Sequence, residues 1–150
     1  MAASISMVNG APTLGTSTGG VFRQTPPGLI TIHPTTVAIN TTATATAAEV
    51  ATGYITSTSA AAVAITLPTG TLLGAALGAT RGTVFDLYID NTAGANTVTI
   101  IIAVNGVLSD AAVSTAASFG DLSVANGVTG LARFTIMFSS ATAYAFTRTA

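Results

Sequence analysis

Residues 83–104 read TVFDLYIDNTAGANTVTIIIAV, two apolar runs joined by a segment of small and polar residues. In the first run Phe85, Leu87 and Ile89 occupy alternate positions, which predicts a β-strand with one buried face. The second run, residues 97–104, alternates in the same way, and NTAGAN between them has the composition of a turn. The stretch therefore predicts two strands joined as a hairpin with a six-residue connection.

Strand-like runs recur before and after this stretch, separated by turns rich in Gly and Asn. The further predicted strands cover residues 53–57, 62–67, 131–139 and 144–148. Within residues 131–139 the alternation predicts a buried face, formed by Ala132, Phe134, Ile136 and Phe138. The residues predicted to face outward are Arg133, Thr135 and Met137.

One short helix is predicted at TLLGAALGA, residues 71–79, with Thr69 or Thr71 as its N-cap. Its predicted apolar face consists of Leu72, Leu73, Ala76 and Leu77. Glycines at positions 70, 74 and 78 form a second stripe, which predicts close packing against a sheet. Many short strands with one short helix are typical of a mainly β fold, a β-sandwich or jelly-roll-like barrel. This predicted β-domain covers residues 49–150.

Residues 1–48 differ from the rest and predict an extended N-terminal arm. They hold four of the five prolines, a GTSTGG cluster and the low-complexity run TTATATAA. Two short alternating pieces, GLITIH and TVAIN, are suited to adding edge strands to a neighbouring subunit. The predicted contacts to capsid or subunit partners are Phe22, Arg23, Leu29, Ile30, Ile32, His33, Val37 and Ile39.

The composition favours a protein that functions in an assembly. Only 6% of the 150 residues are charged, against about 25% in ordinary soluble domains, and the net charge is −1. Such a chain has no long-range attraction to nucleic acid or to anionic lipid. Low charge is typical of buried interface centres. The alternative is a neutral surface kept soluble by threonine hydroxyl groups.

A membrane helix is not predicted. Residues 50–80 carry no charge, but they consist mostly of Ala, Thr and Gly and are interrupted by Pro68. A spanning helix needs about 20 strongly apolar residues with every backbone group satisfied.

The sequence lacks the residues of the common catalytic and metal sites, so we expect no enzyme activity, no metal and no cofactor. There is no Lys and no Cys, which excludes a Schiff-base lysine, a thiolate nucleophile and a disulfide framework. The single histidine, His33, has no orienting carboxylate near it in the sequence. Asp110 and Asp121 are candidate calcium ligands, but no clustered acidic pattern surrounds either.

Asp86 and Asp90 are the one carboxylate pair to consider as a catalytic dyad. Four residues along a strand place them about 13 Å apart, beyond the roughly 5–9.5 Å of glycosidase pairs. We therefore predict structural roles: Asp90 forms a turn with Asn91, and Asp86 faces Arg133 across two strands.

Three segments carry a resemblance to a known family: ITSTSAAAVAITLPTGTLLGAALGA, GTVFDLYIDNTAGANTVTI and LARFTIMFSSATAYAFTRT. Together they resemble the C-terminal β-domain of tailed-bacteriophage structural proteins, namely capsid decoration (cement) proteins and head fibre proteins. The resemblance covers about residues 50–150, while residues 1–48 match no pattern of the family.

The resemblance implies a homotrimeric decoration protein on the outer surface of the virion head, with the major capsid protein as partner. The short chain without heptad or collagen-like repeats favours a decoration protein over a fibre. The alternative within the family is a receptor-binding knob or fibre-head module that uses the loops at residues 105–130. A surface-layer or adhesin module is a third alternative, and it normally shows an export signal.

Overall fold

The computed structural model describes residues 4–8, 11–15, 21–25, 28–33, 35–108 and 122–149. It divides into two units, Met1–Thr36 and Val37–Ala150. The division falls at Thr36, whereas the sequence suggested residue 48. The reason is that two short strands and most of a helix within residues 37–50 belong to the second unit.

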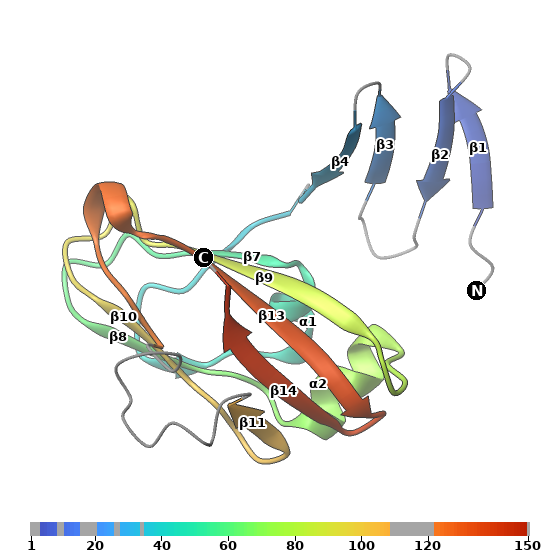
Figure 1. Cartoon of the computed structure of the whole chain (residues 1–150). Coiled ribbons are helices and arrows are strands. Elements are labelled where there is room, and N and C mark those ends of the chain that lie inside the picture. The colour runs from blue at the N-terminus through green and yellow to red at the C-terminus, as the bar shows by residue number, and fades with distance from the viewer. Residues whose placement is uncertain are drawn as a thin grey trace. The chain divides into compact units, whose positions relative to one another are not determined.

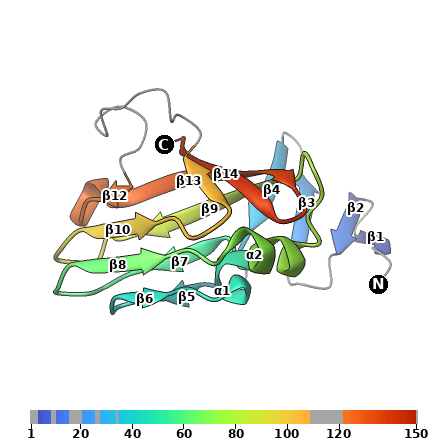
Figure 2. The same ribbon diagram turned by 90° about the horizontal axis from the view of Figure 1, so that it is seen from below.

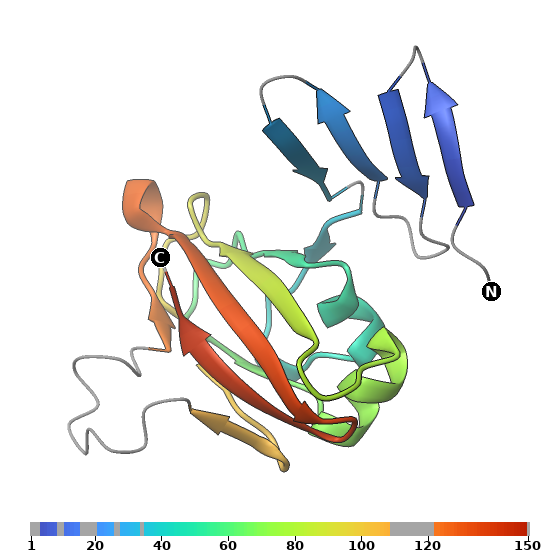
Figure 3. The ribbon, with the colours of Figure 1, turned by 45° about the vertical axis from the view of Figure 1, so that its right-hand side comes forward.

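The first unit contains a four-stranded antiparallel sheet with the order β1-β2-β3-β4 (Figure 3). The strands are β1 (Ser4–Val8), β2 (Ala11–Gly15), β3 (Val21–Thr25) and β4 (Gly28–Ile32). Each strand pairs with the next along the chain, and Arg23 of β3 lies opposite Ile30 of β4. The irregular arm expected here is therefore a meander of short strands. Proline does not prevent this, since Pro12 takes its place in β2 opposite Met7.

The second unit holds two mixed sheets and few helices, so a mainly β fold is confirmed. One sheet has six strands in the order β11-β14-β13-β9-β7-β5, and Figure 1 shows β14, β13, β9 and β7 side by side. Its strands are β5 (Val37–Ala38), β7 (Tyr54–Thr56), β9 (Val84–Asp90), β11 (Gly106–Leu108), β13 (Leu131–Ser140) and β14 (Ala143–Arg148).

The other sheet has four strands in the order β12-β10-β8-β6, and Figure 2 shows β6, β8 and β10 side by side. Its strands are β6 (Ala43–Thr44), β8 (Val63–Thr66), β10 (Val98–Ile101) and β12 (Ser123–Val124). From β5 to β13 each strand lies in the other sheet from the strand before it. The inward faces of both sheets contribute to one buried cluster, which includes Ile65, Leu87, Ile100, Phe134 and Phe146.

The strands predicted within residues 83–104 exist, but the predicted hairpin is wrong. β9 belongs to the six-stranded sheet and β10 to the four-stranded sheet. Both strands bury one face in the shared core, so alternation alone fits one sheet as well as two. The connection between them is held by Asn91, whose amide nitrogen donates to the carbonyl oxygens of Val124, in β12, and of Ala125, directly after it.

The predicted helix is α2 (Gly70–Leu77), and the Thr69 hydroxyl caps it by accepting from the Leu72 amide at 3.3 Å. The predicted apolar face is confirmed for Leu73, which is buried, and for Leu77, which packs against the core, but it is wrong for Leu72, which is 59% exposed, and for Ala76. The buried side of α2 consists of Gly70, Leu73 and Gly74. Both glycines pack closely, since a Cβ at either would overlap the β13–β14 turn, at the carbonyl oxygen of Thr142 or of Ala141.

The glycine stripe is therefore confirmed at two of its three positions. Gly78 packs against nothing. It ends α2 in the left-handed conformation, with φ of 59°.

The structure contains a second helix, α1 (Ala47–Ala51), which was not predicted from the sequence. Thr46 and Glu49 form a capping box, in which the Thr46 hydroxyl accepts from the Glu49 amide and the Glu49 carboxylate accepts from the Thr46 amide at 2.7 Å. A third, single-turn element is the 3-10 helix η1 (Gly127–Thr129). Among the described residues, none of the helices has the length and apolar character of a membrane span.

Candidate functional site

The six-stranded sheet has a face that points away from the core, and we call it the outer face. It is defined by the alternate residues of four strands: Tyr54 and Thr56 of β7, Val84, Asp86, Tyr88 and Asp90 of β9, Leu131, Arg133, Thr135 and Met137 of β13, and Ala145 and Thr147 of β14. The intervening residues of β9 and β13 lie in the core. The outer face therefore follows from the same alternation that predicts the strands.

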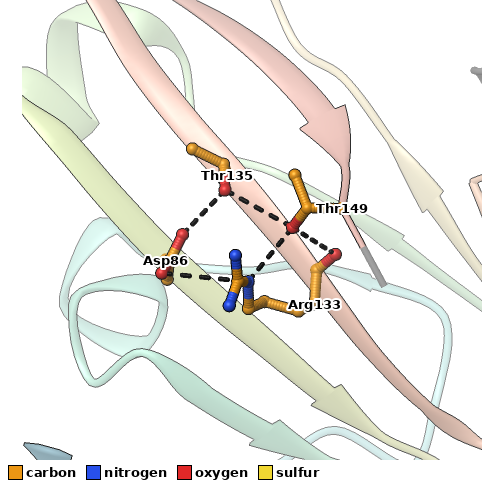
Figure 4. Close-up of polar contacts among 4 residues, drawn as sticks. All are labelled: Asp86, Arg133, Thr135 and Thr149. Carbon is orange, nitrogen blue, oxygen red and sulfur yellow. Dashed lines mark hydrogen bonds and ion pairs between the residues drawn. The ribbon is translucent and has the colours of Figure 1, made fainter.

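A polar network occupies the middle of the outer face (Figure 4). The Thr135 hydroxyl donates to Oδ1 of Asp86 at 2.7 Å, from the position directly opposite across β13 and β9. Nε of Arg133 donates to the Thr149 hydroxyl at 3.1 Å and lies 3.9 Å from Oδ2 of Asp86. The Thr149 hydroxyl in turn donates to the Arg133 carbonyl oxygen at 3.2 Å.

The predicted pairing of Asp86 with Arg133 is thus confirmed, and it is a loose one. Their side chains are 40% and 44% exposed, and the distance between the charged atoms is at the limit of an ion pair. Exposed pairs of this kind contribute about 0–1 kcal/mol. The pair fixes opposite charges side by side on the surface, and it adds little to the stability of the fold.

Two tyrosines and a carboxylate lie next to this network, toward β7. The rings of Tyr54 and Tyr88 stack with centroids 6.1 Å apart, and the Tyr54 hydroxyl donates to Oδ2 of Asp90 at 2.9 Å. Hydrogen bonds from the Thr92 hydroxyl and amide, followed by the one from Tyr54, lower the pKa of Asp90. Partial burial, followed by the bond to Asp90, raises the pKa of Tyr54. Asp90 therefore stays ionised and Tyr54 stays neutral near pH 7, so this pair presents one negative charge.

Large apolar side chains lie toward both ends of β13 on the outer face. Val84 and Met137 are opposite one another in the register of β9 and β13, and they are 56% and 51% exposed. Leu131, near the other end of β13, is 51% exposed. A solvated sheet face normally carries polar residues at such positions. The outer face thus joins apolar ends to a polar middle that carries both signs of charge.

The residues predicted to contact partners fall into two groups. Phe22 and Arg23 lie in β3, and Leu29, Ile30 and Ile32 lie in β4. These two strands pair with each other in an antiparallel register. His33 follows β4 directly.

Val37 and Ile39 contact their own unit instead. Val37 lies opposite Ile55 and packs, partly buried, against the core. Ile39 is 7% exposed and belongs to the core itself. The TVAIN run alternates because its strand joins the six-stranded sheet of its own unit. That these two residues contact a partner stays a prediction.

The calcium candidates Asp110 and Asp121 lie outside the described residues. Within residues 35–108 and 122–149 no group of three or more His, Asp or Glu side chains is arranged to hold a metal ion. Comparisons with protein-family models, with characterised proteins and with solved structures find no match to this chain.

Proposed function

We propose that this chain is a non-enzymatic structural protein of a tailed-phage virion, a homotrimeric capsid decoration protein that binds the major capsid protein on the outer surface of the head. The observation that carries the proposal is the character of the outer face, where a charge-poor chain exposes Val84, Leu131 and Met137 around one pair of opposite charges. Contact surfaces have this composition, with few charges and an enrichment of Met, Arg and Tyr.

The resemblance of residues 50–150 to phage decoration and fibre-head domains supports the same function. We further propose that the two mixed sheets form a β-sandwich, because strands alternate between them and both contribute to one core. A rigid two-sheet domain presents a fixed surface to its neighbours, and rigid surfaces bind without a large ordering cost.

The mechanism is mechanical. A trimer that contacts several capsid subunits at once gains avidity from the number of its contacts, without new chemistry at any one of them. Any ligand that binds the assembled shell more tightly than its free subunits stabilises the shell by that difference. In this proposal residues 1–36 supply the contacts that cross from one capsid subunit to the next.

Deletion of residues 1–36 tests the role assigned to the first unit. The deletion ends there because Val37 pairs with Ile55 and Ile39 lies in the core, so a longer deletion damages the second unit. We expect the shortened chain to keep its β-rich circular dichroism spectrum and its oligomeric state. We expect it to lose sedimentation with phage heads from which the native protein has been removed.

The matched control is full-length protein carrying Val128→Asp, a change at a fully exposed position of η1. It should sediment with heads as the wild-type chain does. Equal head binding by the shortened chain would contradict the role of residues 1–36, and the second unit would then hold the capsid contact.

The alternative function is a receptor-binding knob or fibre-head module. The observation that favours it is the stacked pair Tyr54 and Tyr88 on the outer face, with Asp90 beside them. Aromatic rings next to hydrogen-bonding groups are common in sites that bind small polar ligands. Binding of the purified chain to a glycan array, abolished by Tyr88→Ala, would favour this alternative.

A further inference from the structure

We propose that the occupant of the outer face is a second copy of this chain, so that copies of the protein associate sheet against sheet. The inference goes beyond the proposed function: a face packed against the same face of a second copy is a two-fold contact, which pairs copies and is separate from the contacts that close a homotrimer. The surface of this contact consists of the β7, β9, β13 and β14 residues of the outer face.

Charge complementarity is the first argument. Arg133 uses Nε for Thr149 and for its loose contact with Asp86, and its two terminal nitrogens make no hydrogen bond within the described residues. A guanidinium group binds a carboxylate best through two parallel hydrogen bonds, a geometry that the 3.9 Å contact inside one chain does not provide. Asp86 of a second copy supplies the matching carboxylate. Because each copy carries both groups, each both gives and receives this contact.

The distribution of apolar side chains is the second argument. Val84 and Met137 lie toward one end of β13 and Leu131 toward the other, on either side of the charged pair. Two such faces packed together remove three large apolar side chains per copy from water, at about 25 cal/mol for each Å² of apolar surface. The polar middle is then enclosed between apolar contacts, which is the arrangement that strengthens a hydrogen-bonded ion pair.

Other occupants fit the outer face less well. Its charged residues are Asp86, Asp90 and Arg133, so it offers no basic surface to nucleic acid or to anionic lipid. A partner of strong charge of either sign would meet at least one like charge at short range. A copy of the same face supplies a carboxylate for each Arg133 and a guanidinium group for each Asp86, and symmetric contacts of a chain with itself are the commonest kind of protein association.

The test is sedimentation velocity on the full-length chain without capsids, over a range of concentrations. We expect wild-type protein to associate, and we expect Arg133→Asp and Asp86→Arg each to weaken association at least about tenfold, because each variant brings like charges together. An equimolar mixture of the two variants should regain association, because the first variant carries two carboxylates at these positions and the second carries two guanidinium groups. Repulsion within a single chain does not predict this recovery.

Two controls complete the experiment. Leu72→Asp changes an exposed apolar residue on α2, outside the outer face, and should associate as wild type does. Melting of each variant at the lowest concentration should match wild type within the small contribution of an exposed pair, which shows that the variants are folded.

Three results would overturn the inference: a wild-type chain that stays monomeric at every concentration, single variants that associate normally, or a mixture that fails to recover. None of these measurements involves a capsid. Association through the outer face by a chain that is absent from phage heads would sustain this inference and remove the proposed function. If the chain binds phage heads but its Arg133→Asp and Asp86→Arg variants associate normally, the proposed function is sustained and this inference is removed.

Discussion

Replacing Asn91 with aspartate is expected to lower the free energy of unfolding by about 3 kcal/mol or more at pH 7. Asn91 is completely buried, and its amide nitrogen donates to the carbonyl oxygens of Asn96, Val124 and Ala125 at 2.8, 3.2 and 3.0 Å. These bonds join the end of β9, the start of β10 and β12. An ionised carboxylate in the same place has no proton to donate and faces three carbonyl oxygens. Urea unfolding followed by circular dichroism measures the loss.

The loss of unfolding free energy in the Asn91→Asp variant should also depend on pH, and burial of the new carboxyl group determines the direction of that dependence. Burial among carbonyl oxygens favours the neutral acid, so the pKa of a carboxyl group at this position is raised above its ordinary value of about 3.9. The folded variant then holds more protons than the unfolded chain between the two pKa values, and its stability falls as pH rises through that interval. Acidic solution should therefore return part of the lost stability.

Asn96→Asp is the matched control, because it makes the same chemical change at an exposed amide whose nitrogen donates to the Ala60 carbonyl oxygen at 2.8 Å. We expect it to cost about 1 kcal/mol. Equal losses for the two variants would contradict the role assigned to Asn91 in joining the two sheets.

The second large loss of stability is expected for the Gly74→Ala variant, which changes a buried position of α2. In a helix that is free of other contacts, this change stabilises by about 1 kcal/mol, because alanine loses less backbone freedom than glycine. Here the added methyl group overlaps the Ala141 carbonyl oxygen and lies 3.3 Å from the Phe138 ring. Either α2 or the β13–β14 turn must move, and overpacking of this kind costs about 1–3 kcal/mol. The sign of the change in melting temperature decides between the two effects.

Ala75→Gly, one position further along at an exposed site, controls for helix propensity alone. It should cost about 1 kcal/mol. A Gly74→Ala variant more stable than wild type would show that α2 does not pack closely on the β13–β14 turn.

The strands were predictable from the sequence because their signal is local. The alternation in β13 identifies Ala132, Phe134, Ile136 and Phe138 as buried, and all four are. The pairing of strands was not predictable in the same way. The alternation of β9 and β10 specifies one buried face for each strand, and that condition is met whether the strands share a sheet or face each other across the core. The backbone pairing shows which arrangement holds, since β9 pairs with β7 and β13 while β10 pairs with β8 and β12.

Two further differences have equally specific causes. The start of α1 carries a readable signal, the Thr46-x-x-Glu49 capping box, but it follows a low-complexity run and the helix has only five residues. In α2 the largest residues suggested the buried face, whereas the smallest residues determine it. Gly70 and Gly74 allow the helix backbone to approach the β13–β14 turn, and this leaves Leu72 exposed.

For the candidate site, the sequence predicted the contact between Asp86 and Arg133 and the outward direction of Met137, and both are confirmed. It did not identify the outer face as a whole. That surface gathers residues from β7, β9 and the β13–β14 pair, three parts of the chain that are far apart in the sequence, and the order β14-β13-β9-β7 brings them together only in the folded protein. The available signal was the presence of large apolar residues at outward positions of predicted strands.

The most direct test of the proposed function is immunogold electron microscopy of phage particles, using an antibody against this chain. A capsid decoration protein predicts regular label over the heads of intact particles. Label confined to the tail or its fibres, or particles without label, would contradict that function.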